Sequence, residues 1–118
     1  MGWAEVCAFA TTLPGVAEGT SYGTPALCVK RTFLARLRED GETLVVSVDP
    51  EERGLLLDAH PDALFLTEHY EGWPLVLVSL PKADPALVRG LIEDAWSERA
   101  SRRVVEAWVA ERGEEAKR

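Results

Sequence analysis

Apolar and polar side chains alternate most clearly between residues 26 and 48. This period of two predicts three consecutive antiparallel strands, at residues 26–30, 33–38 and 43–48. The second strand is expected to place Phe33, Ala35 and Leu37 on one face and Leu34, Arg36 and Arg38 on the other. The third is expected to divide into Leu44, Val46 and Val48 against Thr43, Val45 and Ser47. The pattern is typical of a meander with one packed face and one face largely in water.

Turn residues set the limits of this meander. Asp40-Gly41 predicts a hairpin turn, because glycine accepts a positive φ at no steric cost. Before the meander, we expect a loop through Gly19 and Gly23. After it, residues 62–67 and 75–80 are predicted to form two further strands.

The sequence predicts four helices. Trp3, Val6, Cys7 and Ala10 follow an i, i+3, i+4, i+7 pattern that predicts a helix over residues 3–12. Asp-Pro pairs at 49–50 and 84–85 predict the starts of two helices that run to about residues 59 and 97. A last helix is expected to begin after Ser101 and to end at Gly113, with residues 113–118 frayed.

These elements predict one α+β domain over residues 1–118. The chain has no repeat, linker or low-complexity segment, and 118 residues fit a single domain. We expect a curved antiparallel sheet, made of the three-stranded meander and two further strands, packed by helices.

Charge and cysteine content narrow the classes of function. The formal net charge is −7, so the overall field repels phosphate, and only a local basic patch could bind nucleic acid. No apolar run approaches the ~20 residues of a membrane span, and the N-terminus does not have the features of a signal peptide. Cys7 and Cys28 are expected to be reduced, buried thiols. We therefore expect a cytoplasmic protein with no membrane partner, metal or cofactor.

Basic side chains gather in two segments that could contact phosphates. The first group follows the predicted hairpin, and the second lies near the start of the last helix: Lys30, Arg31, Arg36 and Arg38, then Arg99, Arg102 and Arg103. A protruding hairpin could lie along a phosphate backbone, and a helix N-terminus favours anions. The simpler interpretation is an ordinary exposed surface, balanced by acidic neighbours such as Glu39 and Glu106.

Residues 69–74, His-Tyr-Glu-Gly-Trp-Pro, form the most chemically varied segment. Rings on a loop between strands can line a pocket or stack on a base, so His69, Tyr70 and Trp73 are candidate ligand contacts, together with Tyr22 of the glycine-bearing loop. The simpler interpretation is a hydrophobic loop that covers the edge of the sheet.

Four segments, taken together, resemble the MmcQ/YjbR family. They are LPGVAEGTSYGTPALCVKRTFLARL (13–37), LVVSVDPEE (44–52), HYEGWPLVLVSL (69–80) and LIEDAW (91–96). The resemblance spans residues 13–110 and implies a small α+β fold, similar to the double-wing arrangement of DNA-binding domains, with a DNA-binding role. Family members often carry Gly-Lys at the first hairpin turn; this chain has Lys30-Arg31-Thr32, which keeps a basic tip without the glycine.

Three functions remain open at this point. The first is a DNA-binding module that contacts phosphates through Lys30, Arg31, Arg36 and Arg38, with Arg102 and Arg103. The second is an interaction module for a protein or a small ligand, which uses the loop from His69 to Trp73 or the last helix with Trp108, and binds no DNA. The third is an enzyme, which the sequence favours least because no nucleophile, base and orienting group can be assembled by spacing. The sequence does not predict an oligomeric state.

Overall fold

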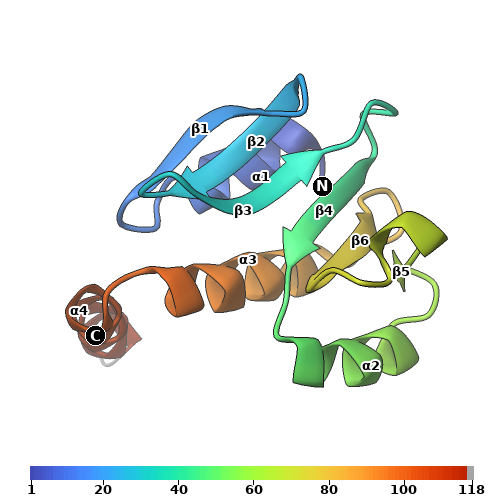
Figure 1. The fold of residues 1–118 in the computed structure, drawn as a ribbon. Helices are drawn as coiled ribbons and strands as arrows, with labels where there is room; N and C mark the ends of the chain where they lie inside the picture. Colours follow the sequence, from blue (N-terminus) through green and yellow to red (C-terminus); the bar gives the residue numbers. More distant parts are fainter. Residues whose placement is uncertain (117–118) are drawn as a thin grey trace.

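The computed structural model of the chain describes residues 1–116 and has an α+β architecture (Figure 1). The six strands are β1 (Val16–Ser21), β2 (Thr24–Val29), β3 (Thr32–Leu37), β4 (Thr43–Ser47), β5 (Leu64–Phe65) and β6 (Leu75–Ser79). The helices are α1 (Trp3–Ala10), α2 (Pro50–Ala59), α3 (Pro85–Arg99) and α4 (Arg102–Ala116), with a 3-10 turn η1 (Glu68–Tyr70). The predicted meander and helices are thus present.

All six strands form one antiparallel sheet in the order β1-β2-β3-β4-β6-β5. The expectation of five strands was wrong, because the segment interpreted as a loop before the meander contains β1. This strand pairs along its whole length with β2, from Val16 opposite Val29 to Ser21 opposite Thr24. At the other end, β5 is much shorter than the predicted strand at residues 62–67.

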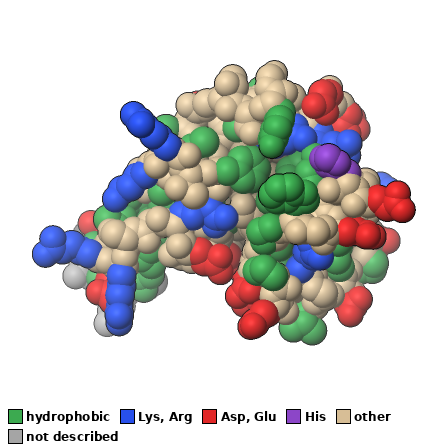
Figure 2. All heavy atoms as spheres, in the orientation of Figure 1, with side chains coloured by type: hydrophobic (Ala, Val, Ile, Leu, Met, Phe, Trp, Pro, Cys, Tyr) green, Lys and Arg blue, Asp and Glu red, His purple; other side chains and the backbone are tan. Residues whose placement is uncertain are grey.

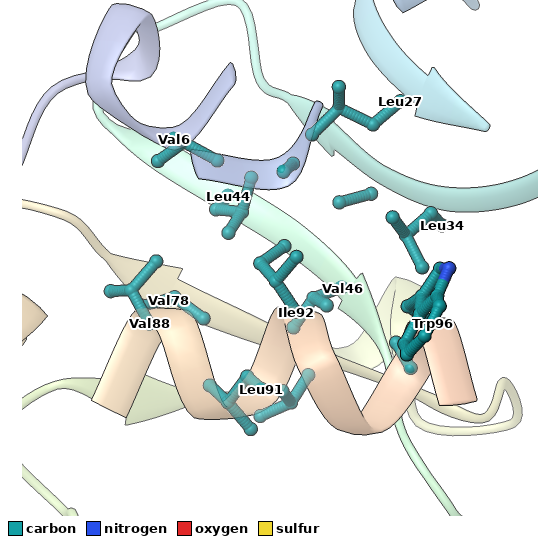
Figure 3. Close-up of a cluster of buried hydrophobic side chains, with 14 of the residues drawn as sticks. Val6, Leu27, Leu34, Leu44, Val46, Val78, Val88, Leu91, Ile92 and Trp96 are labelled. Atoms are coloured by element: carbon teal, nitrogen blue, oxygen red, sulfur yellow. The ribbon is translucent and has the colours of Figure 1, made fainter. Parts of the chain in front are cut away.

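Helices α1 and α3 cover one face of the sheet and form the main core with it. Side chains of α3, among them Val88, Ile92 and Trp96, point toward the sheet residues Leu44 and Val46 (Figure 3). Trp96 is fully buried, and its indole N–H donates a 2.8 Å hydrogen bond to the carbonyl oxygen of Pro14. This bond joins α3 to the segment between α1 and β1, so the helices and the sheet edge share one core.

A β-bulge in β3 changes which side chains face this core. Leu27 lies opposite Ala35, whereas Cys28 lies opposite Phe33, so Leu34 is an extra residue in the ladder. Leu34 and Ala35 therefore both pack in the main core. The prediction that Phe33 shares a face with Ala35 was wrong: Phe33 packs with Val45 and Leu77 on the opposite face.

That opposite face is covered rather than wet. Every residue of β4 is buried, including Thr43, Val45 and Ser47, which were expected in water. Tyr70 of η1 is buried there against Val45 and Leu77, so a second, smaller apolar cluster lies on this face. The segment between β5 and β6 therefore covers part of this face and contributes Tyr70 to its apolar cluster.

The predicted helix starts are confirmed at Asp49 and Asp84, whose side chains accept hydrogen bonds from Glu51 N (2.9 Å) and Ala86 N (2.8 Å). Ser101 likewise accepts a bond from Val104 N at 3.3 Å. The predicted end at Gly113 was wrong, because α4 continues to Ala116, and residues 117–118 lie outside the described part of the chain. Helix α4 packs against the core through Val104, Val105 and Trp108, and the Trp108 ring meets that of Trp96 edge to face at 5.0 Å.

Both cysteines are free thiols, as expected, but only Cys7 is buried and Cys28 is partly exposed. Burial, and then the neighbouring Glu18 carboxylate, raise the pKa of the Cys7 thiol to about 12. Among the described residues, no helix is both long enough and apolar enough to span a bilayer.

Candidate functional site

A pocket of about 750 Å³ opens on the face of the sheet opposite α1 and α3. Its floor comes from the central strands β3 and β4, through Phe33, Arg36, Val45 and Ser47. One side is formed by Tyr22 of the β1–β2 turn, and the other by the segment from His69 to Leu75. In Figure 2, hydrophobic side chains and a histidine group near the middle of the face in view.

Arg36 is a buried charged group in the lining of the pocket. Only 8% of this residue is exposed, and its guanidinium donates hydrogen bonds to Thr24 Oγ1 (3.1 Å) and to Tyr70 Oη (2.6 Å). Both acceptors are neutral. Among the described residues, the carboxylate that comes within 4 Å is that of Glu39, at 3.7 Å, and the Glu39 side chain is 70% exposed. Arg36 is therefore a buried cation whose one nearby carboxylate, at 3.7 Å, makes a long ion pair and remains mostly in solvent.

Arg99, at the end of α3, lines the same pocket. Its Nε donates a 2.7 Å bond to the carbonyl oxygen of Phe33, and one terminal nitrogen donates a 2.9 Å bond to the carbonyl oxygen of Ala95. No carboxylate of the described residues lies within 4 Å of its guanidinium. The pocket thus contains two arginines, whose charge is opposite to the net charge of the chain, and a single carboxylate, Glu39.

The aromatic side of the pocket is anchored through its backbone. Arg53 of α2 donates hydrogen bonds to the carbonyl oxygens of Trp73 (2.5 Å) and Glu71 (2.9 Å), and Trp73 N donates to Tyr70 O at 3.1 Å. The rings of His69 and Tyr70 meet edge to face, with centroids 4.9 Å apart. The segment that carries these rings is therefore held to α2 through Arg53 and closed by a backbone bond of its own.

The structure brings together the four residues that the sequence suggested as ligand contacts. Tyr22, His69, Tyr70 and Trp73 all line this one pocket, although Tyr22 is 47 residues or more from the other three. Sequence reasoning missed the contributions of Phe33, Ser47 and Arg99. The alternation that would have revealed Phe33 is hidden by the bulge, and Arg99 reaches the pocket only because α3 packs under β3.

The basic residues suggested as phosphate contacts differ in exposure: some lie on the surface and Arg36 is buried. Lys30 and Arg31 are exposed at the β2–β3 turn, and Arg102 and Arg103 are exposed at the start of α4, where Arg102 forms a 3.0 Å ion pair with Glu106. Arg36 is buried, and the guanidinium of Arg38 lies 6.0 Å from the centre of the Tyr70 ring. Arg36 therefore does not lie on the exposed hairpin face that a phosphate contact requires, because it is inside the pocket floor.

Potential metal-ligating side chains are not clustered in the described part of the chain. Within residues 1–116, no three His, Cys, Asp or Glu side chains are grouped so that they could hold a metal ion. The pocket instead offers arginine N–H donors, hydroxyl groups and aromatic surface.

This chain belongs to the YjbR family, whose model matches residues 11–98. Similar curated proteins are uncharacterised proteins of Mycobacterium tuberculosis (Rv2570) and Mycobacterium bovis (Mb2600), each 32% identical over 72 residues. The match covers 58% of this chain and 56% of each relative, so the chain spans little more than half the length of the curated relatives. The crystal structure of the Deinococcus radiodurans protein DR2400, with its domain DUF419, is similar in fold, with a TM-score of 0.69 and 20% identity over 88% of this chain and 85% of that one.

Proposed function

We propose that this YjbR-family protein is a binding module that takes a small anionic ligand in the pocket above Arg36. The observation that supports this most strongly is the environment of Arg36, which is buried, donates its hydrogen bonds to neutral acceptors, and has only a long, 3.7 Å ion pair with the mostly solvated Glu39. Buried charges in native proteins are normally paired, because desolvation of an unpaired ion is expensive. A ligand carboxylate or phosphate would supply a closer partner than the solvated Glu39 carboxylate does.

The other features of the pocket support the same proposal. Its volume of about 750 Å³ lies in the range of small-molecule sites, and its walls combine aromatic surface with a few polar groups. The second arginine, Arg99, has an unneutralised guanidinium, and a low-dielectric cleft strengthens its attraction for an anion.

Calorimetric titration with 1-naphthyl phosphate tests this proposal, because the probe joins an anion to an apolar ring. We expect saturable 1:1 binding, and Arg99→Gln should weaken it about 10-fold, since charge-assisted hydrogen bonds contribute more than neutral ones. Arg89→Gln is the matched control, because Arg89 is an exposed arginine of the same helix outside the pocket, and it should leave the affinity unchanged. Equal losses in both variants, or no binding by the wild type, would contradict a pocket-specific anion site.

A second candidate function is duplex DNA binding through one basic end of the molecule. The 2.7 Å bond from Arg99 to the Phe33 carbonyl holds the end of α3 against the start of β3, so Lys30, Arg31, Arg102 and Arg103 are carried by neighbouring segments. Figure 2 shows Lys and Arg side chains that project at this end, where the β2–β3 turn and α4 lie in Figure 1. Lys30 and Arg31 also adopt positive φ values of 48° and 72°, so non-glycine residues occupy a turn that normally favours Gly or Asn.

This candidate predicts duplex affinity that falls steeply with salt, because phosphate contacts release counterions. The double variant Arg31→Ala/Arg103→Ala should lower the affinity in a fluorescence-anisotropy titration and reduce the salt slope by about two contacts. Arg36→Met should leave DNA affinity unchanged, because Arg36 is buried. Absence of duplex binding at about 20–50 mM salt excludes this function, since electrostatic binding is strongest at low salt.

A further inference from the structure

Two aromatic side chains of the pocket are unusually exposed. Tyr22 is 90% exposed and Trp73 is 60% exposed, whereas Tyr70, between them in the lining, is 8% exposed. Large aromatic rings usually gain stability by burial, and these two gain little of it. Their exposure therefore needs a reason other than packing of the fold.

The two rings lie on different sides of the pocket floor. Tyr22 belongs to the turn between β1 and β2, and Trp73 belongs to the loop that leads into β6. In the sheet order, β3 and β4 lie between these strands and supply the floor residues Phe33, Arg36 and Val45. A ligand on the floor would therefore meet a ring on either side.

The backbone at Tyr22 has a conformation that is unfavourable for a bulky residue. Tyr22 and Gly23 have φ values of 52° and 77°, a pair that the tightest hairpin turns require and that Asn-Gly fulfils at low cost. A bulky residue with a positive φ is an outlier, and such strain tends to occur at functional sites. The guanidinium of Arg36 lies over the Tyr22 ring, 5.6 Å from its centre, within the range of a cation–π contact.

Trp73 has a hydrogen-bonded backbone and an exposed ring. The hydrogen bond from Arg53 fixes its carbonyl oxygen, and its own N–H is bonded to Tyr70 O at 3.1 Å, while the indole lines the pocket. Because the backbone that carries the ring is already fixed, stacking of a ligand costs only the rotamer entropy of the Trp73 side chain.

We infer that Tyr22 and Trp73 form an aromatic clamp, and that the anionic ligand carries a flat aromatic ring next to its phosphate or carboxylate group. This inference rests on the proposed function, because Arg36 and Arg99 hold the anion while the two rings hold the flat part. Each ring offers a stacking surface that does not depend on the identity of the ring atoms. The ligand class is therefore an aromatic anion, such as a mononucleotide or an aromatic acid.

Four probes separate the parts of this inference: 1-naphthyl phosphate, 1-naphthoate, 1-naphthol and inorganic phosphate. We expect at least one of the two aromatic anions to bind at least about 10-fold more tightly than either 1-naphthol or inorganic phosphate, because only it uses both the arginines and the rings. The ratio between 1-naphthyl phosphate and 1-naphthoate then shows whether the site prefers phosphate or carboxylate.

Variants of the clamp give the decisive comparison. Tyr22→Ala and Trp73→Ala should each weaken the tighter aromatic anion about 10-fold, whereas Tyr22→Phe and Trp73→Phe should retain most of the affinity. Phe65→Ala is the matched control, because Phe65 is an exposed aromatic residue outside the pocket. Tyr22→Asn should raise the unfolding midpoint by a few degrees and still weaken binding, since it relieves the strain and removes the ring.

The outcomes distinguish this inference from the proposed function. If inorganic phosphate binds as tightly as both aromatic anions, and the clamp variants change nothing, the clamp is overturned while anion binding stands. If no anion binds the wild type, or if Arg36→Met leaves the affinity unchanged, the proposed function fails as well.

Discussion

Replacement of Arg36 by methionine is expected to weaken anion binding strongly and leave the fold intact. Arg36 is a buried cation that lines the pocket, and its two side-chain hydrogen bonds go to Thr24 and Tyr70. Loss of its charge-assisted bonds to a bound anion should lower the affinity for 1-naphthyl phosphate about 100-fold.

The same substitution should change the free energy of unfolding by less than about 2 kcal/mol, because two effects oppose each other. Methionine removes the desolvation penalty of a poorly paired buried charge, and exchange of buried ions for apolar groups is often neutral or stabilising. Against this, Tyr70 Oη and Thr24 Oγ1 lose a donor. Thr24 keeps its bond to Ser21 O at 2.9 Å, which limits that loss.

Titration and urea denaturation of the same preparations check both halves of this prediction. Arg36→Lys keeps the charge and loses the planar fork, so it should recover only part of the affinity. Arg89→Met serves as the control for a general loss of positive charge. A variant that unfolds with a large loss of stability would show that Arg36 serves the fold, and retained affinity would remove it from the site.

Replacement of Trp96 by alanine should give the largest loss of stability in the protein. Trp96 is the largest fully buried side chain of the described residues, and it contacts the sheet, the segment at Pro14 and the Trp108 ring. Truncation of such a residue costs about 3–5 kcal/mol through lost burial and a residual cavity. The Pro14 carbonyl also loses its donor.

Denaturant titrations of three variants separate these contributions. Trp96→Phe keeps a buried ring and loses the N–H bond. Its loss of stability should therefore be about 1–2 kcal/mol smaller than that of the alanine variant. Trp73→Ala is the control for loss of an indole and should cost less than about 1 kcal/mol, because Trp73 is 60% exposed. A loss at Trp96→Ala no greater than that at Trp73→Ala would contradict the described core.

Local signals in the sequence predicted much of the fold. The alternation in β3 and β4, the Asp-Pro helix starts and the Asp40-Gly41 turn all depend on residues close together in the chain. The structure explains the Asp40-Gly41 turn: the Asp40 carboxylate accepts hydrogen bonds from Glu42 N and Thr43 N, both at 2.9 Å. It also accepts a 2.7 Å bond from the Thr43 hydroxyl, which is the main reason that the pKa of Asp40 is lowered.

Strand β1 and the bulge were missed for physical reasons. β1 is an edge strand whose residues 17–20 are exposed, so no buried face imposes an alternating pattern on Ala-Glu-Gly-Thr. The bulge at Leu34 arises from the pairing of β3 with β2, and residues 33–35 alone do not reveal it. One inserted residue moved Phe33 to the opposite face of the sheet.

The candidate site was predictable only in its separate parts. Aromatic residues on two loops marked Tyr22 and the segment from His69 to Trp73, but nothing local indicated that the two loops face one pocket. The burial of Arg36 depends on Thr24 and Tyr70, which lie 12 and 34 residues away. Sequence alone therefore placed this arginine on an exposed strand face, where its charge would have suited a phosphate backbone.

The central claim is that the arginines and rings of one pocket bind the same aromatic anion. A ¹H–¹⁵N NMR titration with 1-naphthyl phosphate tests this directly, because it observes the side-chain N–H groups of Arg36, Arg99 and Trp73 separately. We predict that these resonances shift together and saturate with one dissociation constant, while those of the β2–β3 turn at Lys30 and Arg31 stay in place. Shifts confined to Lys30, Arg31 and the start of α4, with the pocket unchanged, would contradict the account.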